Sequence, residues 1–318
     1  MLGYTIRRVL WIVPVLWVIA TITFFLMWAV PGGPFTHEKE RPPGLEKALQ
    51  EKYGLDDPVW EQYARYLGNL LQGDLGISFQ GDDPVSEIIR RSGFISAQIA
   101  FLCLLTAVVI GISLGTMSAL NHNGVLDYVG VTFATVGASV PNFVLAAFLV
   151  IVFAVNLNWF AASGWGGPAT FSELFDLSVY DWRKMVLPVV SLSVLPTAYI
   201  ARVTRASVLE VLNQDYIRTA RAKGLQERNV VLRHTLKNSM IPVLTVIGPI
   251  AALLISGSFI IETMFAINGL GRESIGAVQR RDYGLIMGTT LFFALVVAFA
   301  NLVVDLLYAA VDPRIRYR

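Results

Sequence analysis

Long apolar segments separated by shorter polar ones run along most of the chain. Six of these segments are long enough to cross a bilayer as helices, because about 20 apolar residues span its hydrocarbon core. They occupy residues 9–30, 96–120, 129–155, 186–206, 242–265 and 284–308. The pattern therefore predicts an all-α polytopic membrane protein with six transmembrane helices.

Prolines fall inside the third and fourth segments and modify this prediction. A proline inside a helix removes one backbone hydrogen bond and clashes with the preceding turn. We expect Pro141 to kink the third segment, and Pro188 and Pro196 to interrupt the fourth. In the second segment, Gly111 and Gly115 form a pair of small residues that would let another helix approach closely.

The polar segment between the first two spans has a helical pattern of its own. This segment, residues 31–95, contains eleven acidic and seven basic residues. Within it, residues 58–71 place apolar side chains on one face at helical spacing, which predicts an amphipathic helix. We expect Asp57 to cap the start of this helix and Gly73 to end it.

The pattern divides the chain into four parts. We expect an N-terminal transmembrane helix at residues 1–30, an extracytoplasmic segment at 31–95, a five-helix core at 96–308 and a cytoplasmic tail at 309–318. The core contains a long charged interruption, which we expect to form a cytoplasmic loop at residues 207–241.

Basic residues indicate which side of the membrane each segment faces. Of the 25 lysines and arginines, 13 fall in segments predicted to be cytoplasmic and five in short outside segments. The other seven lie in residues 31–95, a segment too long to follow the positive-inside rule. The asymmetry predicts that both termini are cytoplasmic. Outside the loop at 207–241, the inside set is Arg7, Arg8, Arg202, Arg205, Arg314, Arg316 and Arg318.

Composition supports the same class. The 318 residues are 55% hydrophobic and 15% charged, whereas a soluble domain is about 25% charged. The net charge of +2 produces no overall basic field that would indicate nucleic acid. The single cysteine, Cys103, lies in an apolar segment and cannot form an internal disulfide.

The sequence offers little support for enzymatic chemistry. It contains no Gly-Lys pair, so it has no P-loop that would hold nucleotide phosphates. Its three histidines, His37, His122 and His234, are far apart and predict no metal site. We therefore expect no cofactor on this chain, and favour a pore-forming subunit that depends on an external energy source.

The charged interruption itself is residues 214–242, QDYIRTARAKGLQERNVVLRHTLKNSMIP. It carries six basic residues against Asp215 and Glu227. Gly224 divides it into two helical pieces, and we expect a positive φ there because glycine takes the left-handed conformation at helix ends without steric cost. Arg221 and Lys223 would lie in the preceding turn, where the helix dipole favours cations.

The residue order of this segment resembles the conserved cytoplasmic loop of bacterial ABC importer permeases. That loop reads Glu-Ala-Ala, three residues, Gly, and later Ile-x-Leu-Pro. The family positions are occupied here by Arg218, Thr219, Ala220, Gly224, His234, Leu236 and Lys237. The departures from the general pattern agree with the dipeptide, oligopeptide and nickel branch, in which YxRTARAKG is followed by RHxLxNxxIP.

Further matches to this branch extend along the chain. They are PGGP at 31–34, the stretch GLDDPVWEQYARYLGNLLQGDLGISF at 54–79, NGLGRES at 268–274, and Asp305 with the tail YAAVDPRIRYR at 308–318. On these residues the chain is identified as a member of the branch, which implies a type I ABC importer permease fold.

The resemblance also implies a function and partners. It implies a permease subunit that forms the translocation path for short peptides delivered by an extracytoplasmic binding protein. Its partners would be a second homologous permease and two cytoplasmic ATPases, which bind the ATP and Mg, in the bacterial inner membrane. The loop residues implied to dock on an ATPase are Arg218, Thr219, Ala220, Arg221, Ala222, Lys223, Gly224 and Leu225.

Several alternatives stay open. Within the family, the cargo would instead be nickel or another small solute. Outside it, an ion-coupled secondary transporter would need polar clusters deep in the spans and an internal repeat, and neither is visible in the sequence. The amphipathic helix at 58–71 either covers the outer ends of the spans or contacts the substrate-delivery protein.

Two carboxylates near the ends of spans have two interpretations each. Glu262, near the outer end of the fifth segment, is a candidate residue of the translocation path or a helix-end carboxylate held by its neighbours. For Asp305 we favour the second interpretation, in which the carboxylate pairs with a neighbouring span or with water.

Overall fold

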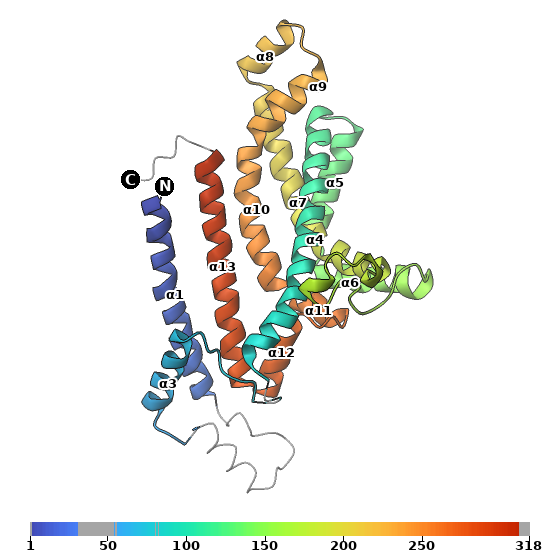
Figure 1. Ribbon diagram of the computed structural model, residues 1–318. Helices are drawn as coiled ribbons and strands as arrows, with labels where there is room; N and C mark the ends of the chain where they lie inside the picture. The colour runs from blue at the N-terminus through green and yellow to red at the C-terminus, as the bar shows by residue number, and fades with distance from the viewer. Residues whose placement is uncertain (1, 31–53, 55, 80, 82, 312–318) are drawn as a thin grey trace.

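The computed structural model describes residues 2–30, 54, 56–79, 81 and 83–311, and this part of the chain is helical, with no strand. Five long helices stand side by side (Figure 1). They are α1 (Leu2–Ala29), α4 (Val85–Leu120), α7 (Trp182–Leu212), α10 (Lys237–Gly257) and α13 (Tyr283–Val311). Each contains an apolar stretch long enough to cross a membrane, which confirms five predicted spans.

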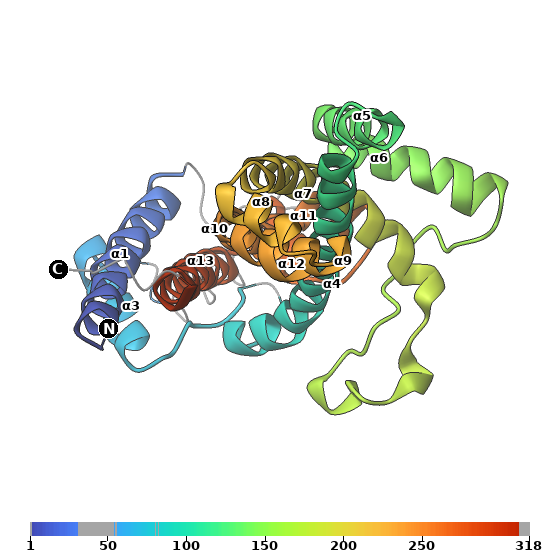
Figure 2. The ribbon, with the colours of Figure 1, turned by 90° about the horizontal axis from the view of Figure 1, so that it is seen from above.

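Shorter helices connect the long ones. They are α3 (Val59–Leu71), α5 (Val125–Ser139), α6 (Asn142–Leu149), α8 (Asp215–Ala222), α9 (Glu227–Asn229), α11 (Phe259–Met264) and α12 (Leu270–Arg280), with π-helices η1 (Val150–Asn156) and η4 (Val230–Leu236) and single 3-10 turns η2 (Phe171–Glu173) and η3 (Leu177–Val179). Figure 2 shows α1 and α5 at opposite sides of the bundle, with α7, α10 and α13 between them.

The third predicted span is broken rather than kinked. Helix α5 ends at Ser139, and α6 continues with η1 in a direction 103° away. Val140 is extended, with ψ of 122°, because a residue before proline avoids the helical conformation. Pro141 then occupies the N-cap of α6. The chain has six spans when this bent pair is counted as one.

The predicted interruption of the fourth span is wrong. Helix α7 runs without a break through Pro188 and Pro196, and both prolines are buried. In its most apolar stretch 61% of the residues are buried, more than in any other long helix among the described residues. Its packing against α4, α5 and α10 therefore outweighs the loss of one backbone hydrogen bond at each proline.

The bounds of two other spans also differ from the prediction. Helix α4 begins at Val85 rather than at residue 96. The charged side chains of its first turns interrupt the apolar pattern, but they lie on the exposed side, and Val85, Ile88 and Ile89 pack against α12 and α13. The fifth span begins before Pro242 and ends at Gly257. Glu262 therefore lies on the separate helix α11.

The predicted amphipathic helix is present as α3 and packs on the end of α1. The Tyr63 hydroxyl lies 2.7 Å from the Thr21 hydroxyl, and the Phe24 ring contacts the rings of Tyr63 and Tyr66. Leu71, by contrast, is 89% exposed although the helical pattern placed it on the apolar face. Within this chain α3 therefore covers one end of α1, and its contact with a substrate-delivery protein stays a prediction.

The predicted end of α3 is confirmed, but its predicted N-cap is wrong. Asp57 does not cap the helix: Pro58 occupies the N-cap, and the Asp57 carboxylate pairs with Arg65 instead. Gly73 ends the helix as predicted, with φ of +79°. Three features of the sequence lie outside the described residues: the PGGP match at 31–34, His37 and the tail at 312–318.

Candidate functional site: the loop between α7 and α10

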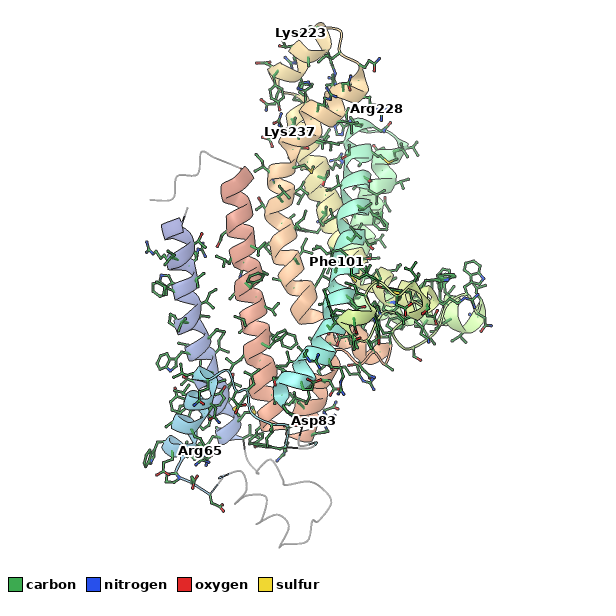
Figure 3. The ribbon with its side chains drawn as sticks, in the orientation of Figure 1. Arg65, Asp83, Phe101, Lys223, Arg228 and Lys237 are labelled. Carbon is green, nitrogen blue, oxygen red and sulfur yellow. The ribbon has the colours of Figure 1, made fainter. Side chains whose placement is uncertain are left out.

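The charged loop projects beyond the other helices at one end of the bundle (Figure 1). It consists of α8, α9 and the π-helix η4, and only Asn213 and Gln214 separate α7 from α8. Figure 3 shows Lys223 and Arg228 at this end and Arg65 at the opposite end. The loop is therefore attached directly to two long helices, α7 and α10.

Gly224 forms the turn at the tip of the loop. Its φ is +74°, which confirms the predicted positive value. The Gly224 N–H donates to the Arg221 carbonyl at 2.9 Å, and the Leu225 N–H donates to the Ala220 carbonyl at 3.4 Å. These two bonds define a Schellman motif, which reverses the chain at the end of a helix.

The two small residues of the tip have different surroundings. Ala220 is buried with Ile217 against Val230, so it lies where α8 meets the second half of the loop. A Cβ added at Gly224 would meet no atom within 4 Å. Among the described residues the tip is therefore open, and none of them would prevent another surface from approaching Gly224.

Basic side chains surround the open tip. Arg221 donates to both carboxylate oxygens of Glu227, at 3.2 and 2.7 Å, across the turn. This hydrogen bonding raises the pKa of Arg221. The Arg218 side chain is 73% exposed and lies 3.7 Å from Asp215. Lys223, Arg228, Arg233 and Lys237 are also exposed.

A π-helix occupies the second half of the loop and was not predicted. Within η4 the Thr235 hydroxyl donates to the Val230 carbonyl at 3.2 Å, and both residues are buried. Single π-helical turns are rare and occur frequently at functional sites. The sequence pattern of this stretch does not distinguish a π-turn from an α-turn, because the two differ only in which carbonyl each N–H reaches.

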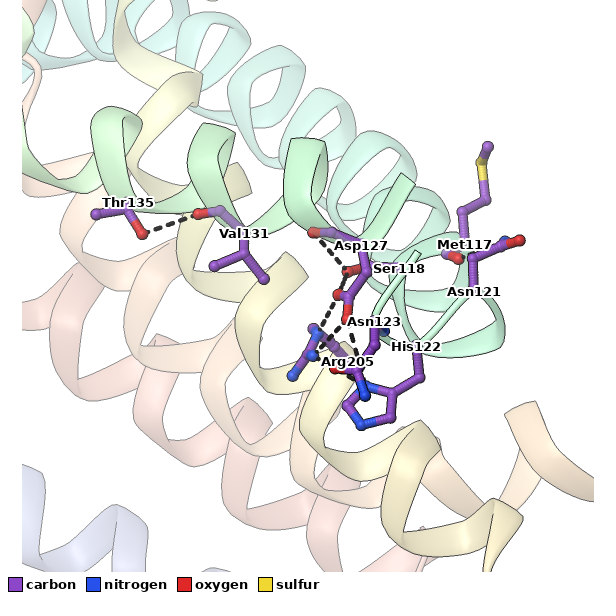
Figure 4. A network of polar contacts seen from close by, with 9 residues as sticks. All are labelled: Met117, Ser118, Asn121, His122, Asn123, Asp127, Val131, Thr135 and Arg205. Carbon is purple, nitrogen blue, oxygen red and sulfur yellow. Dashed lines mark hydrogen bonds and ion pairs between the residues drawn. The ribbon is translucent and has the colours of Figure 1, made fainter. Parts of the chain in front are cut away.

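A polar network beside the loop was also not predicted. Arg205 of α7 donates to both oxygens of Asp127, at 2.6 and 2.7 Å (Figure 4). The Asn123 N–H donates to the same carboxylate at 2.9 Å, and the Ser118 hydroxyl donates to it as well. The sequence pattern indicated Arg205 only as one of the basic residues on the predicted cytoplasmic side, and it gave no role to Asp127. The sequence feature that could have indicated this pair is an aspartate just before one apolar segment together with an arginine within another.

His122 belongs to this network rather than to a plain polar loop. Its Nδ1 lies 3.3 Å from an oxygen of Asp127 and 3.2 Å from Nη2 of Arg205. Among the described residues, no three His, Cys, Asp or Glu side chains come together in a way that would hold a metal ion.

Ser113 lies in a Gly-x-Ser-x-Gly sequence, residues 111–115. In hydrolases this pattern presents a nucleophilic serine on a turn between a strand and a helix. Here Ser113 lies inside α4 and donates its hydroxyl to the Val109 carbonyl at 2.7 Å. The local structure is therefore not a nucleophile turn.

Glu262 has no exposed surface in this chain. Its carboxylate accepts hydrogen bonds from the Ser96 hydroxyl at 2.7 Å, the Ser258 hydroxyl and the Arg272 N–H at 3.0 Å. The Ser96 oxygen also accepts from the Leu270 N–H at 2.8 Å, so the pair holds the N-terminus of α12. A role for Glu262 in the translocation path stays a prediction.

Asp305 pairs with a neighbouring span, as favoured above. Its carboxylate lies 3.1 Å from Nη1 of Arg8, which joins α13 to α1.

A separate apolar groove of about 600 Å³ lies inside the bend between α5 and α6. Its walls include Tyr128, Phe133 and Val136 of α5 and Val194 of α7.

Comparison with known families covers nearly the whole chain. Residues 107–317 match the family described as "Binding-protein-dependent transport system inner membrane component". Residues 1–99 match the N-terminal region of the same kind of membrane component.

Relatives of known name are similar over their full length. The dipeptide transport system permease protein DppB of Bacillus subtilis is 40% identical over 99% of this chain and 98% of its own. The oligopeptide transport system permease protein OppB of Salmonella typhimurium is 41% identical over 100% of both chains. The OppB protein of Escherichia coli K12 is 40% identical, again over 100% of both chains.

Solved structures share the fold at low sequence identity. An inward-facing structure of the MetNI methionine ABC transporter superposes with a TM-score of 0.53 and 15% identity, covering 71% of this chain and 97% of that chain. An amino acid ABC transporter with histidines superposes with a TM-score of 0.51 and 16% identity, covering 71% and 94%.

Proposed function

The chain belongs to the family of inner-membrane components of binding-protein-dependent transport systems, and from this membership we propose that it forms the membrane path of an ATP-driven importer of short peptides. Support comes from relatives named as dipeptide and oligopeptide permeases, which are about 40% identical over essentially the whole chain. The substrate class is the part of the proposal that relies on those names.

The observation that carries the coupling part of the proposal is the open tip at Gly224. The tip projects from the bundle, is ordered by a Schellman motif and has free space around its backbone. We propose that residues 218–225 dock in a groove of a cytoplasmic ATPase. The surrounding arginines and lysines then pair with acidic groups of the ATPase or with lipid head groups.

The loop transmits the movement of the ATPases to the membrane. Because α8 follows α7 after two residues and η4 leads directly into α10, displacement of the loop displaces both long helices. Movement of packed helices as rigid bodies can open a path alternately to the two membrane faces. Closure and opening of the ATPases would drive this alternation.

The assembly contains partners that this chain does not supply. We propose a second homologous permease, two ATPase subunits that bind ATP and Mg, and an extracytoplasmic binding protein. Both termini would be cytoplasmic. The first residues of α1 and the charged loop lie at the same end of the bundle, and α3 lies at the other (Figure 1), which supports this orientation.

Uptake by reconstituted vesicles tests the proposal. The chain would be assembled with its partner subunits in proteoliposomes loaded with ATP, and uptake of labelled dipeptides and longer peptides would be measured. We expect uptake that requires hydrolysable ATP and the binding protein. Uptake of nickel but not of peptide would select the alternative cargo. Uptake driven by an ion gradient without ATPases would identify a secondary transporter.

A further inference from the structure

We infer that Asp127 and Arg205 are positioning residues that make α5 move together with α7 when the charged loop is displaced. The inference rests on the proposed function, because it concerns how movement of the loop reaches the membrane path. It assigns a role to the network of Figure 4, whose residues lie outside residues 218–225, the segment proposed to dock on an ATPase.

Arg205 is rigidly connected to the loop. It lies near the end of α7, which is a regular helix as far as Leu212, and α8 begins at Asp215. The Ser207 hydroxyl donates to the Ser239 carbonyl at 2.9 Å, which joins α7 to the start of α10. The other side of the loop contains the π-helix η4. The α-helical side therefore gives the loop its most regular connection to the spans.

Asp127 is held as firmly as its partner. It is 4% exposed, and its carboxylate accepts from the Asn123 N–H and the Ser118 hydroxyl in addition to Arg205. These bonds attach the carboxylate to the end of α4 and to the turn before α5. A guanidinium that donates to both oxygens of a carboxylate fixes orientation as well as distance. The pair therefore restrains rotation of α5 against α7.

Close backbone packing surrounds the pair. A Cβ at Gly115 of α4 would overlap the Ala201 carbonyl and lie 2.7 Å from Cβ of Thr204, both on α7. A Cβ at Gly130 of α5 would lie 3.2 Å from the Ser118 side chain of α4. At these two glycines α4 lies against α7 and α5 lies against α4, and a pocket of about 200 Å³ between the three helices is lined by Gly115, Gly130 and Arg205. The ion pair therefore joins α5 to α7 at a place where packing alone leaves space between them.

The far end of α5 is not continuous with the next helix. At Pro141 the chain turns by 103° into α6, and the apolar groove lies inside this bend. Helix α6 also packs against α7. An α5 that stays with α7 therefore keeps the angle at Pro141 and the shape of the groove, whereas an α5 that slips against α7 alters both. The pair links displacement of the loop to this region of the membrane-embedded surface.

The number of ATP molecules hydrolysed per peptide taken up tests the inference. In the reconstituted assembly we expect Asp127→Asn and Arg205→Gln each to raise this ratio by at least about tenfold, because removing one partner of a buried charge pair is costly. The ATPases should still co-purify with both variants, since the residues that surround Gly224 are unchanged. A pair that only stabilises the fold would lower hydrolysis and uptake together and leave the ratio unchanged, which would overturn the inference.

Arg90→Gln is the matched control. Arg90 donates to both oxygens of Glu87, at 3.0 and 2.7 Å, in the same geometry but within α4 at its opposite, exposed end. Because the Arg90–Glu87 pair lies within one helix, we expect Arg90→Gln to hydrolyse as many ATP molecules per peptide as the parent chain does. An increase equal to that of Arg205→Gln would overturn the inference, since it would show that loss of any such pair uncouples the transporter.

A covalent replacement of the pair provides a rescue. Asp127→Cys and Arg205→Cys would be combined in a Cys103→Ala chain, assembled with cysteine-free partners and purified. The same sample would be measured before and after treatment with a short bifunctional thiol reagent. We expect a high ratio before bridging and recovery to within about twofold of the parent after it. A high ratio that persists after complete bridging would overturn the inference. If the parent chain itself takes up no peptide, the proposed function fails instead.

Discussion

At the scale of single residues, two fully buried carboxylates stabilise the end of the molecule opposite the charged loop. Glu262 accepts from two serine hydroxyls and one backbone N–H, and Asp282 accepts from the Phe79 N–H at 3.0 Å and the Ser78 hydroxyl. Within the described part of the chain, neither carboxylate forms an ion pair with a basic side chain. Hydrogen bonds to neutral donors therefore offset the cost of burying both groups.

The first prediction concerns Glu262. Glu262→Gln places an amide where at least three donors converge, so one donor loses its acceptor without a change in side-chain volume. We expect a destabilisation of about 1–3 kcal/mol, seen as a lower melting temperature of the purified chain in detergent. Glu273→Gln is the control, because Glu273 is partly exposed and only pairs with Arg280 at 3.5 Å. Equal melting of Glu262→Gln and the parent would contradict the assigned hydrogen bonds.

The second prediction concerns Gly224. Gly224→Val introduces a β-branched side chain at a φ of +74°, which costs about 1–2 kcal/mol at the tip. We expect normal insertion into the membrane but strongly reduced peptide uptake and substrate-stimulated ATP hydrolysis in the reconstituted assembly. Because the described residues leave open space around Gly224, the loss of uptake and hydrolysis would arise from the altered turn and from a clash of the valine side chain with the ATPase.

Two further variants separate these causes. Gly224→Asn adds a side chain of similar size that tolerates the left-handed conformation, so it tests bulk without most of the strain. Arg218→Ala removes an exposed charge worth about 0–1 kcal/mol and should have a smaller effect than Gly224→Val. If Gly224→Val transports like the parent, the loop serves only to orient the chain in the membrane.

At the scale of elements, α3 and the charged loop lie at opposite ends of the bundle (Figure 3). Helix α3 is attached to α1 by the hydrogen bond between Tyr63 and Thr21 and by stacked aromatic rings. The loop is attached to α7 and α10 at the other end. Membrane orientation can therefore be tested by comparing one exposed residue from each element.

The third prediction uses single cysteines at Ala64 and Gln226, which are both exposed. In a Cys103→Ala background, the cysteine at 64 should react with an impermeant thiol reagent in intact cells. The cysteine at 226 should react only after the cells are lysed, because the excess of basic residues predicts a cytoplasmic location for the loop. Labelling of both positions from the same side would exclude the proposed topology.

At the scale of the whole molecule, the proposed function makes the chain a membrane path whose energy source lies on other subunits. The sequence contains no Gly-Lys pair, so it offers no P-loop for nucleotide phosphates. The fourth prediction is that the purified chain alone neither binds nor hydrolyses ATP. Equilibrium binding of a labelled nucleotide would be compared with that of the assembled transporter, and saturable binding to the isolated chain would contradict the prediction.

The sequence by itself determined the class of fold, the apolar segments that form the spans and the position of the charged loop. These features depend on local properties: a bilayer requires about 20 apolar residues for each helix, and a turn such as that at Gly224 requires a residue that accepts a positive φ. The family could be identified for the same reason, since the loop and the segment at 54–79 carry their motifs in consecutive residues.

Only the tertiary structure decided features that depend on residues far apart in the sequence. Helix α7 continues through two prolines because its neighbours bury it, whereas the chain at Pro141 turns by 103°. Asp127 and Arg205 are 78 positions apart, and Ser96 and Glu262 are 166 apart. No periodicity within one segment indicates such pairs, because their free energy depends on how separate helices pack against one another.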